Sequence, residues 1–267
     1  CGVCIARCPA DALNFAPFID VGDQEHKNYM WYLDQPISFP NKNKLLKDNR
    51  EGRIFKHPTP KALAFQSPMH EFSGACAGCG HSGTLRMLTQ MFGSSLNLAV
   101  VTGCSSVYSI PFPSAAIGVD REPGRGPSFA RSLFENNAEF GCGMAMRTDY
   151  FHSFLKENIK DSLPSIVTDR DIPTRLVTSL RAFVDVADKS YESRIVSYQI
   201  MCQLHLLKSK IPDVFQRHPC FKNIDELQDY IPKISNWIVM GDGAAYDIGS
   251  AGVDNVLGSG RDVNILV

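Results

Sequence analysis

The sequence predicts an α/β protein built on a doubly wound, parallel sheet. The prediction rests on three expected strands and on the glycine turn and helix that connect the last two. An apolar run over 96–101 is typical of a short buried strand, and a second strand is expected over 237–240. The second strand runs into Gly241-Asp242-Gly243, followed by a helix expected over 248–257 and a third strand over 263–267. Strand, glycine turn, helix and strand form a βαβ unit, whose strands lie parallel in one sheet.

Apolar residues recur at helical spacing in three further stretches. One helix is expected after the Gly-Cys-Gly loop of residues 78–80, a second over 173–187, and a third beginning near Pro127. The defining positions are Leu85, Leu88, Met91 and Phe92 in the first, Leu176, Leu180 and Phe183 in the second, and Phe129, Leu133 and Phe140 in the third.

The chain divides into three parts by composition. Residues 1–15 are rich in cysteine, and residues 16–70 contain six prolines and a charged stretch, which predicts an extended connection. The alternating strand and helix patterns occupy residues 71–267. The chain begins at Cys1 and ends at Val267 within an apolar run, so we expect a segment of a longer polypeptide with the α/β domain truncated at its C-terminus.

The composition is that of an ordinary globular protein, with 44% hydrophobic and 21% charged residues. The 27 Lys and Arg residues nearly balance the 28 Asp and Glu residues, so the sequence carries no global basic field to attract nucleic acid or an anionic membrane. We recognise no apolar run long enough to span a bilayer and no signal peptide. We therefore expect neither a nucleic acid nor a membrane as a partner.

The nine cysteines fall into clusters. An odd number without secretory features argues against a disulfide framework and favours metal or cluster ligation in a reducing compartment. Three of the cysteines sit in no ligand motif and are expected to be ordinary buried thiols. The nine are Cys1, Cys4, Cys8, Cys76, Cys79 and Cys104, and the three outside a motif, Cys142, Cys202 and Cys220.

The first cluster is Cys1-x-x-Cys4-x-x-x-Cys8-Pro9. This spacing matches the last three cysteines of the bacterial ferredoxin run, in which one short loop surrounds several corners of a [4Fe–4S] cluster. A structural zinc knuckle is the alternative. The proline after Cys8 favours the ferredoxin interpretation.

The second cluster is Cys76-Ala77-Gly78-Cys79, with Cys104 following at the end of the strand expected over 96–101. Glycines let the backbone approach a ligand closely, and the helix expected after this loop offers N–H groups to an anion. Three thiolates are one short of the usual four, and the spacing suits zinc about as well as iron–sulfur.

Two glycine-flanked charges complete the candidate chemistry. Asp242 between Gly241 and Gly243, at the end of a strand, suits Mg²⁺ holding a diphosphate, although Gly-Asp-Gly is also a common turn. Arg125 between two glycines suits a phosphate or a carboxylate, and the alternative there is a plain loop before a capped helix.

Taken together, five ordered segments resemble the pyruvate:ferredoxin (flavodoxin) oxidoreductase family. The resemblance covers residues 1–15, about 71–147 and 237–267. The segments after the ferredoxin-like run are Glu71 to Gly80, Thr102-Gly103-Cys104-Ser105-Ser106, Gly124-Arg125-Gly126-Pro127 with Ser132 to Gly141, and Gly241 to Gly249.

The resemblance implies cofactors and the residues that bind them. Cys76, Cys79 and Cys104 would bind the [4Fe–4S] cluster nearest to thiamine diphosphate, with a fourth ligand further along the polypeptide. Asp242 would bind Mg²⁺. Gly103, Cys104, Phe134, Gly241 and Gly243 would line the cofactor cleft. Cys1, Cys4 and Cys8 would bind clusters of a ferredoxin-like domain, whose C-terminal part is residues 1–15.

The function implied is oxidative decarboxylation of a 2-oxoacid, most simply pyruvate, to acyl-coenzyme A and CO₂. Electrons would pass through [4Fe–4S] clusters to ferredoxin or flavodoxin. The catalytic and substrate-binding residues are expected outside this chain, so the fragment alone should be inactive. The resemblance also implies a homodimer of the full-length protein, located in the cytosol or in an organelle such as a hydrogenosome.

Three departures from the family pattern concern the substrate and the cofactor. His81 stands where the pyruvate enzymes have an acidic residue, Ala244 stands in place of a tryptophan, and residues 110–122 diverge. Two alternatives to the enzyme are a non-catalytic iron–sulfur electron-transfer module that has lost thiamine chemistry, and a zinc-stabilised α/β binding domain.

Overall fold

The computed structural model describes residues 3–14, 18–34, 69–109, 116–119 and 125–267. The chain divides into two compact units, residues 1–57 and residues 58–267. In the first unit the described helices are α1 (Val3–Ala6) and α2 (Phe18–Asp34).

Helix α2 differs from the extended connection predicted for residues 16–70. The prolines of that stretch fall outside residues 18–34, so nothing interrupts the helix there. An ion pair one turn apart, between Lys27 and Asp23 at 2.6 Å, lies on its exposed surface. The rest of the predicted connection, residues 35–68, lies outside the described residues.

The described part of the second unit is centred on one sheet with the strand order β2-β1-β3-β4, and every pairing in it is parallel. The strands are β1 (Leu96–Val100), β2 (Ser128–Arg131), β3 (Ser235–Val239) and β4 (Asn264–Leu266). The predicted parallel βαβ unit is therefore confirmed, since β3 and β4 pair directly across two intervening helices.

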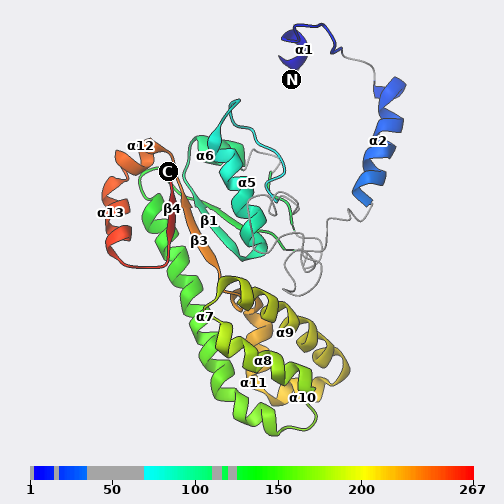
Figure 1. Ribbon diagram of the computed structural model, residues 1–267, viewed down its shortest axis with the longest axis vertical. Helices are drawn as coiled ribbons and strands as arrows, with labels where there is room; N and C mark the ends of the chain where they lie inside the picture. Colours follow the sequence, from blue (N-terminus) through cyan, green and yellow to red (C-terminus); the bar gives the residue numbers. More distant parts are fainter. Residues whose placement is uncertain (1–2, 15–17, 35–68, 110–115, 120–124) are drawn as a thin grey trace, which may run out of the picture. The chain divides into compact units, whose positions relative to one another are not determined.

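Helices cover both faces of the sheet, as in a doubly wound fold (Figure 1). On one face α5 (Gly80–Phe92) packs Leu85 and Leu88 against Leu98 of β1. The 3-10 turn η1 (Gly93–Ser95) then leads from α5 into β1. On the other face the first turns of α7 (Asn137–Thr168), with α12 (Asp242–Tyr246) and α13 (Ser250–Gly258), pack against Ala99 and Ile238.

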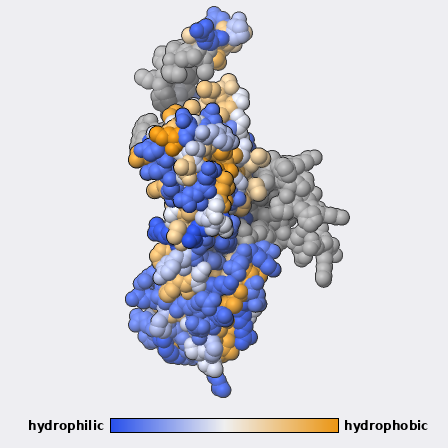
Figure 2. Space-filling view, turned by 90° about the vertical axis from the view of Figure 1, so that its left-hand side faces the viewer, coloured by the Kyte–Doolittle hydropathy of each residue, from blue (hydrophilic) through white to orange (hydrophobic). Residues whose placement is uncertain are grey.

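Beyond the sheet, α7 continues into a helical layer that has a hydrophobic core of its own. The layer comprises α8 (Thr174–Val186), α9 (Ser190–Lys210), α10 (Pro212–Arg217), α11 (Pro219–Glu226) and η2 (Gln228–Tyr230). Its fully buried side chains include Phe183 and Phe221. The face of this layer seen in Figure 2 is largely hydrophilic. Among the described residues, no helix combines the length and the apolar character that a membrane span requires.

One helix prediction was wrong. A helix was expected from Pro127, but Ser128–Arg131 form strand β2, which pairs with Asn97–Val100 of β1. The helix begins ten residues later, at Asn137. A four-residue edge strand is too short to show an alternating pattern, and sheet pairing decided its conformation. The helices predicted after residue 80 and over 173–187 are confirmed as α5 and α8.

Candidate functional site

The chemistry-bearing glycines and acidic residues lie where three parallel strands end at one edge of the sheet. Backbone hydrogen bonds join the chain segments there: the N–H of Ser132 donates to the carbonyl of Val100 at 3.0 Å, and that of Val101 to Val239 at 3.1 Å. The hydroxyl of Thr102 donates to the carbonyl of Ser132 at 2.6 Å. The loops that follow β1, β2 and β3 are therefore held side by side at the carboxyl edge, where open α/β sheets bind ligands.

The side chain of Asn137, the first residue of α7, links the chain segments at the ends of β2 and β3. Its side-chain amide donates to the carbonyl of Val239 at 3.3 Å, and its oxygen accepts the hydroxyl of Ser132 at 2.6 Å. The side chain is almost fully buried, so these hydrogen bonds satisfy a polar group that would otherwise be costly. Sequence reasoning missed Asn137. The Asn-Asn pair ahead of a helical pattern was the available signal.

The turn after β1 depends on glycine. Gly103 has φ +136°, a conformation that residues with a side chain rarely adopt. Its N–H donates to the hydroxyl of Ser106 at 3.2 Å, and this hydroxyl donates to the carbonyl of Gly103 at 3.0 Å. The turn delivers Cys104 to the first position of α6 (Cys104–Ser109), with its side chain exposed.

The turn after β3 presents a carboxylate in an open position. Gly241 precedes α12, and Asp242 is the first residue of that helix and is exposed. A Cβ added at Gly243 would lie 3.2 Å from the ring of Phe134, so the aromatic side chain after β2 lies against this glycine. The structure thus brings Phe134 next to the Gly-Asp-Gly turn, although they are far apart in sequence.

The second cysteine cluster lies in the turn before α5. The N–H of Cys79 donates to the carbonyl of Cys76 at 3.1 Å, and Gly78 within this turn has φ +78°. Helix α5 packs against α6, which begins at Cys104. In the parts of the chain that the structure describes, no group of three or more His, Cys, Asp or Glu side chains is placed to hold a metal ion. Cluster ligation by Cys76, Cys79 and Cys104 stays a prediction.

In the first unit, the ferredoxin-like cysteines are described in part. Cys1 lies outside the described residues, and Cys4 is in α1. The N–H of Ala12 donates to the sulfur of Cys8 at 3.3 Å. This hydrogen bond, followed by that from Ala10, lowers the pKa of the Cys8 thiol because both favour the thiolate, which is the form that binds metal. Ligation by Cys1, Cys4 and Cys8 also stays a prediction.

Two of the three departures from the family pattern are described. His81 is in the first turn of α5, and burial lowers the pKa of its imidazole, which favours the neutral form. Ala244 is buried in the cluster that joins α12 to the sheet. Of the divergent stretch, residues 110–115 and 120–122 lie outside the described residues.

The remaining cysteines match their prediction in part. Cys220 is buried, and burial raises the pKa of its thiol to about 11. Cys142 is half-buried beside the sheet. Cys202 is exposed on α9, so the prediction of a buried thiol was wrong there. The pattern of α9 gave no basis for distinguishing its covered and exposed sides.

A parallel sheet covered on both faces, with a glycine turn and a carboxylate at its carboxyl edge, is the arrangement of α/β proteins that bind a ligand outside the strand ends. Comparison of the sequence with known proteins shows which family within this class the chain resembles. The chain is 36% identical over 271 residues to the pyruvate:ferredoxin oxidoreductase of Moorella thermoacetica. It is 34% identical over 279 residues to the pyruvate-flavodoxin oxidoreductase of Nostoc sp..

A third relative is the pyruvate dehydrogenase [NADP(+)] of Cryptosporidium parvum, 33% identical over 300 residues. Each alignment covers the whole of this chain but only 14 to 21% of the relative. No protein-family model matches the chain. The resemblance indicated by the motifs is confirmed. It also extends through residues 16–70 and 148–236, in which the sequence analysis found no family motif.

Proposed function

We propose that this chain is part of a pyruvate:ferredoxin or pyruvate:flavodoxin oxidoreductase and forms much of its thiamine-diphosphate-binding domain. The observation that carries the proposal is the convergence of Gly103, Phe134 and Asp242 at one edge of a parallel sheet. Similarity to such enzymes along the whole chain supports it. Residues 1–15 would be the end of a ferredoxin-like domain.

The residues at the carboxyl edge fit a diphosphate with its metal ion. Asp242 supplies an exposed carboxylate, the kind of oxygen ligand that Mg²⁺ prefers. A Cβ at Gly241 or Gly103 would meet no other atom within 4 Å, so both glycines border open space rather than packed side chains. The ring of Phe134 adds an apolar wall beside Gly243. When bound, thiamine diphosphate supplies the group that takes up the electron pair released on decarboxylation.

The exposed thiols fit the chemistry of iron–sulfur ligation. Cys76 and Cys104 are exposed free thiols. Cys76 lies in the turn before α5 and Cys104 begins α6, and these two helices are in contact. We propose that they bind one [4Fe–4S] cluster together with Cys79 and a ligand from outside this chain. Cys1, Cys4 and Cys8 would bind clusters that carry electrons onward to ferredoxin or flavodoxin.

The chain's own residues have three tasks in this proposal. Asp242 holds the metal, the Gly103 turn leaves room for the cofactor, and Asn137 keeps the strand ends at a fixed spacing. The residues that activate the cofactor and recognise the substrate lie elsewhere in the longer protein. Coenzyme A is the proposed acyl acceptor, and the full-length protein is proposed to be a homodimer in the cytosol or in an organelle.

The test is the 2-oxoacid-dependent reduction of a viologen dye by the parent protein, expressed without oxygen, with and without coenzyme A. We expect coenzyme-A-dependent reduction with pyruvate and much less with 2-oxoglutarate. Absence of reduction with every 2-oxoacid, in protein shown to contain iron, sulfide and thiamine, would contradict the enzyme and favour an electron-transfer module. Zinc in place of iron would favour a zinc-stabilised binding domain.

A further inference from the structure

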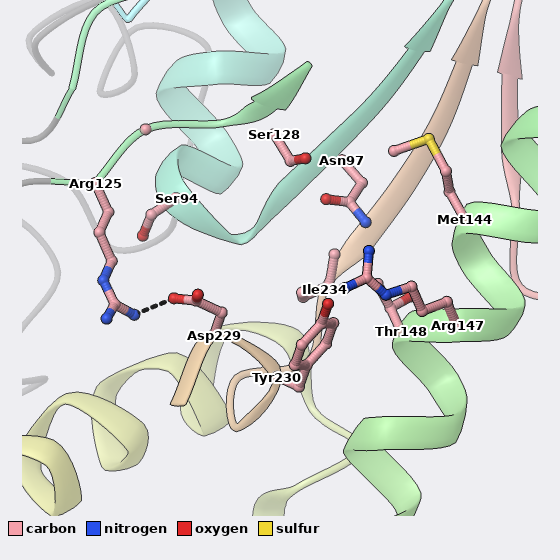
Figure 3. Close-up of a pocket in the computed structure, with 11 residues that line it drawn as sticks. Ser94, Asn97, Arg125, Ser128, Met144, Arg147, Thr148, Asp229, Tyr230 and Ile234 are labelled. Carbon is pink, nitrogen blue, oxygen red and sulfur yellow. Dashed lines mark hydrogen bonds and ion pairs between the residues drawn. The ribbon is translucent and has the colours of Figure 1, made fainter. Parts of the chain in front are cut away.

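At the amino edge of the sheet, opposite the site described above, a hollow opens between the sheet and the helical layer (Figure 3). Its volume is about 390 Å³, within the range of small-molecule sites. Asn97 and Ser128, which are paired near the starts of β1 and β2, line it from the sheet. Arg147 of α7 and Tyr230 of η2 line it from the helices.

Arg147 is held in place without an ionic partner. Its guanidinium lies 5.5 Å from the ring centre of Tyr230 and 5.9 Å from that of Phe151, distances of cation–π contact. Among the described residues, no hydrogen bond or ion pair of Arg147 is found. Figure 3 shows its guanidinium extended from α7 towards the hollow, between Tyr230 and Asn97. Because two aromatic rings already contact this cation, an anion that binds it restricts little further motion of the side chain.

Arg125 and Asp229 stand on the other side of the hollow and form an ion pair with each other. The lining therefore carries two positive charges and one negative charge, a net charge of +1. The hydroxyls of Ser94, Ser128 and Tyr230 also line the hollow, and none has a hydrogen bond to another part of the chain that the structure describes. Unused donors around an unpaired cation are the features of an oxyanion site.

We propose that this hollow binds the phosphate group of a small phosphorylated molecule, with Arg147 as the principal contact. The planar guanidinium and the three hydroxyls together offer more hydrogen-bond donors than the two oxygens of a carboxylate can accept. The three acceptor oxygens of a phosphate group match this set of donors better. Such binding is independent of the thiamine chemistry proposed above, because the two sites lie at opposite ends of the strands. With strands rising about 3.3 Å per residue, they are separated by roughly 13 Å or more.

The proposal is tested by titrating the purified parent protein, with its cofactors bound, with inorganic phosphate and, separately, with acetate at constant ionic strength. The heat of binding is measured by isothermal titration calorimetry. Phosphate is expected to bind saturably and acetate much more weakly. Arg147→Gln should weaken phosphate binding by about tenfold or more, since a charge-assisted hydrogen bond is lost. Arg147→Lys keeps the positive charge but loses the planar array of donors, so its affinity for phosphate should lie between those of the unmodified protein and Arg147→Gln.

Two further variants make the test specific. Asp229→Asn removes the one carboxylate of the lining and frees Arg125, so it should tighten phosphate binding by about two- to fivefold. Arg181→Gln, at an exposed position on α8 outside the hollow, is the matched control and should change nothing. An equal loss of phosphate affinity in Arg147→Gln and Arg181→Gln would mean that phosphate responds only to the overall charge of the protein, and this would overturn the proposal. Acetate binding as tight as phosphate would overturn the assignment to phosphate.

Discussion

Gly141 shows how a single missing side chain sets the distance between a helix and the sheet. A Cβ at this position would overlap the side chain of Ile238 and lie 3.0 Å from that of Ala99. Helix α7 therefore crosses β1 and β3 at a separation that only glycine permits. Gly143, two residues further along the same helix, borders open space.

These two glycines predict opposite effects of the same substitution. Gly141→Ala should lower the free energy of unfolding by about 1–3 kcal/mol, because an added methyl group overpacks the core. Gly143→Ala should raise it by about 0.5–1 kcal/mol, because alanine favours the helix and meets no obstacle. Urea denaturation of both variants checks this, and similar changes of one sign would contradict the packing described.

At the scale of elements, His152 joins three parts of the helical layer. Its ring nitrogens lie 2.9 Å from the carbonyl oxygen of Tyr230 in η2 and 3.1 Å from that of Ala187 after α8. The side chain is buried, and burial is the main reason that its pKa lies below the usual 6.5. Lys233 lowers the pKa further, whereas the two carbonyls and Asp188 oppose the shift.

This pKa shift predicts a pH dependence of stability. Because the folded protein holds the His152 proton less tightly than the unfolded chain, the stability due to the neutral ring is complete above about pH 6.5 and is lost as the pH falls below it. His152→Gln should flatten the unfolding free energy between pH 6.5 and 5. His205→Gln, at an exposed position on α9, is the control. An unchanged slope in His152→Gln would contradict the assignment.

The elements that the sequence predicted best are those whose pattern was long or bounded by glycines. Helices α5 and α8 repeat apolar residues over several turns, and β3 runs directly into Gly241. Strand β2 was missed because four residues carry too little periodicity. Its conformation depends on pairing with β1, which is contact between distant residues. Helix α2 was missed because the proline content of the surrounding stretch dominated the interpretation.

The same distinction holds for the candidate site. Cys104 and Asp242 were candidates because each follows a predicted strand beside a glycine, and Gly103 because of the family resemblance. The structure places all three directly after β1 or β3. Asn137 and Arg147 were not candidates, since their roles come from hydrogen bonds and ring contacts made across the fold. No local pattern encodes such contacts.

At the scale of the second unit, the helical layer and the sheet have separate hydrophobic cores. One core lies within α7 to α11 and includes Phe183, and the others flank the sheet and include Leu98. Helix α7 contributes to both sides. Local opening of the helical layer should therefore be separable from opening of the sheet.

Phe183→Ala tests this separation. Loss of a fully buried aromatic side chain should cost about 3–5 kcal/mol, and the loss should fall mainly on the helical layer. Hydrogen exchange followed by mass spectrometry should show faster exchange in α8 and α9 than in β1 and β3. In the matched variant Leu98→Ala the sheet should lose protection first. Uniform acceleration throughout in both variants would mean that the cores unfold as one.

The central claim is that the carboxyl edge of the sheet holds a metal-bound diphosphate through Asp242, and thiamine diphosphate retention in the purified parent protein measures it most directly. Thiamine diphosphate, magnesium and iron would be quantified in Asp242→Asn and in Asp254→Asn, a control at an exposed position on α13. We predict that Asp242→Asn loses thiamine diphosphate and magnesium while keeping its iron, and that Asp254→Asn keeps all three. Full thiamine diphosphate and magnesium content in Asp242→Asn would contradict the account.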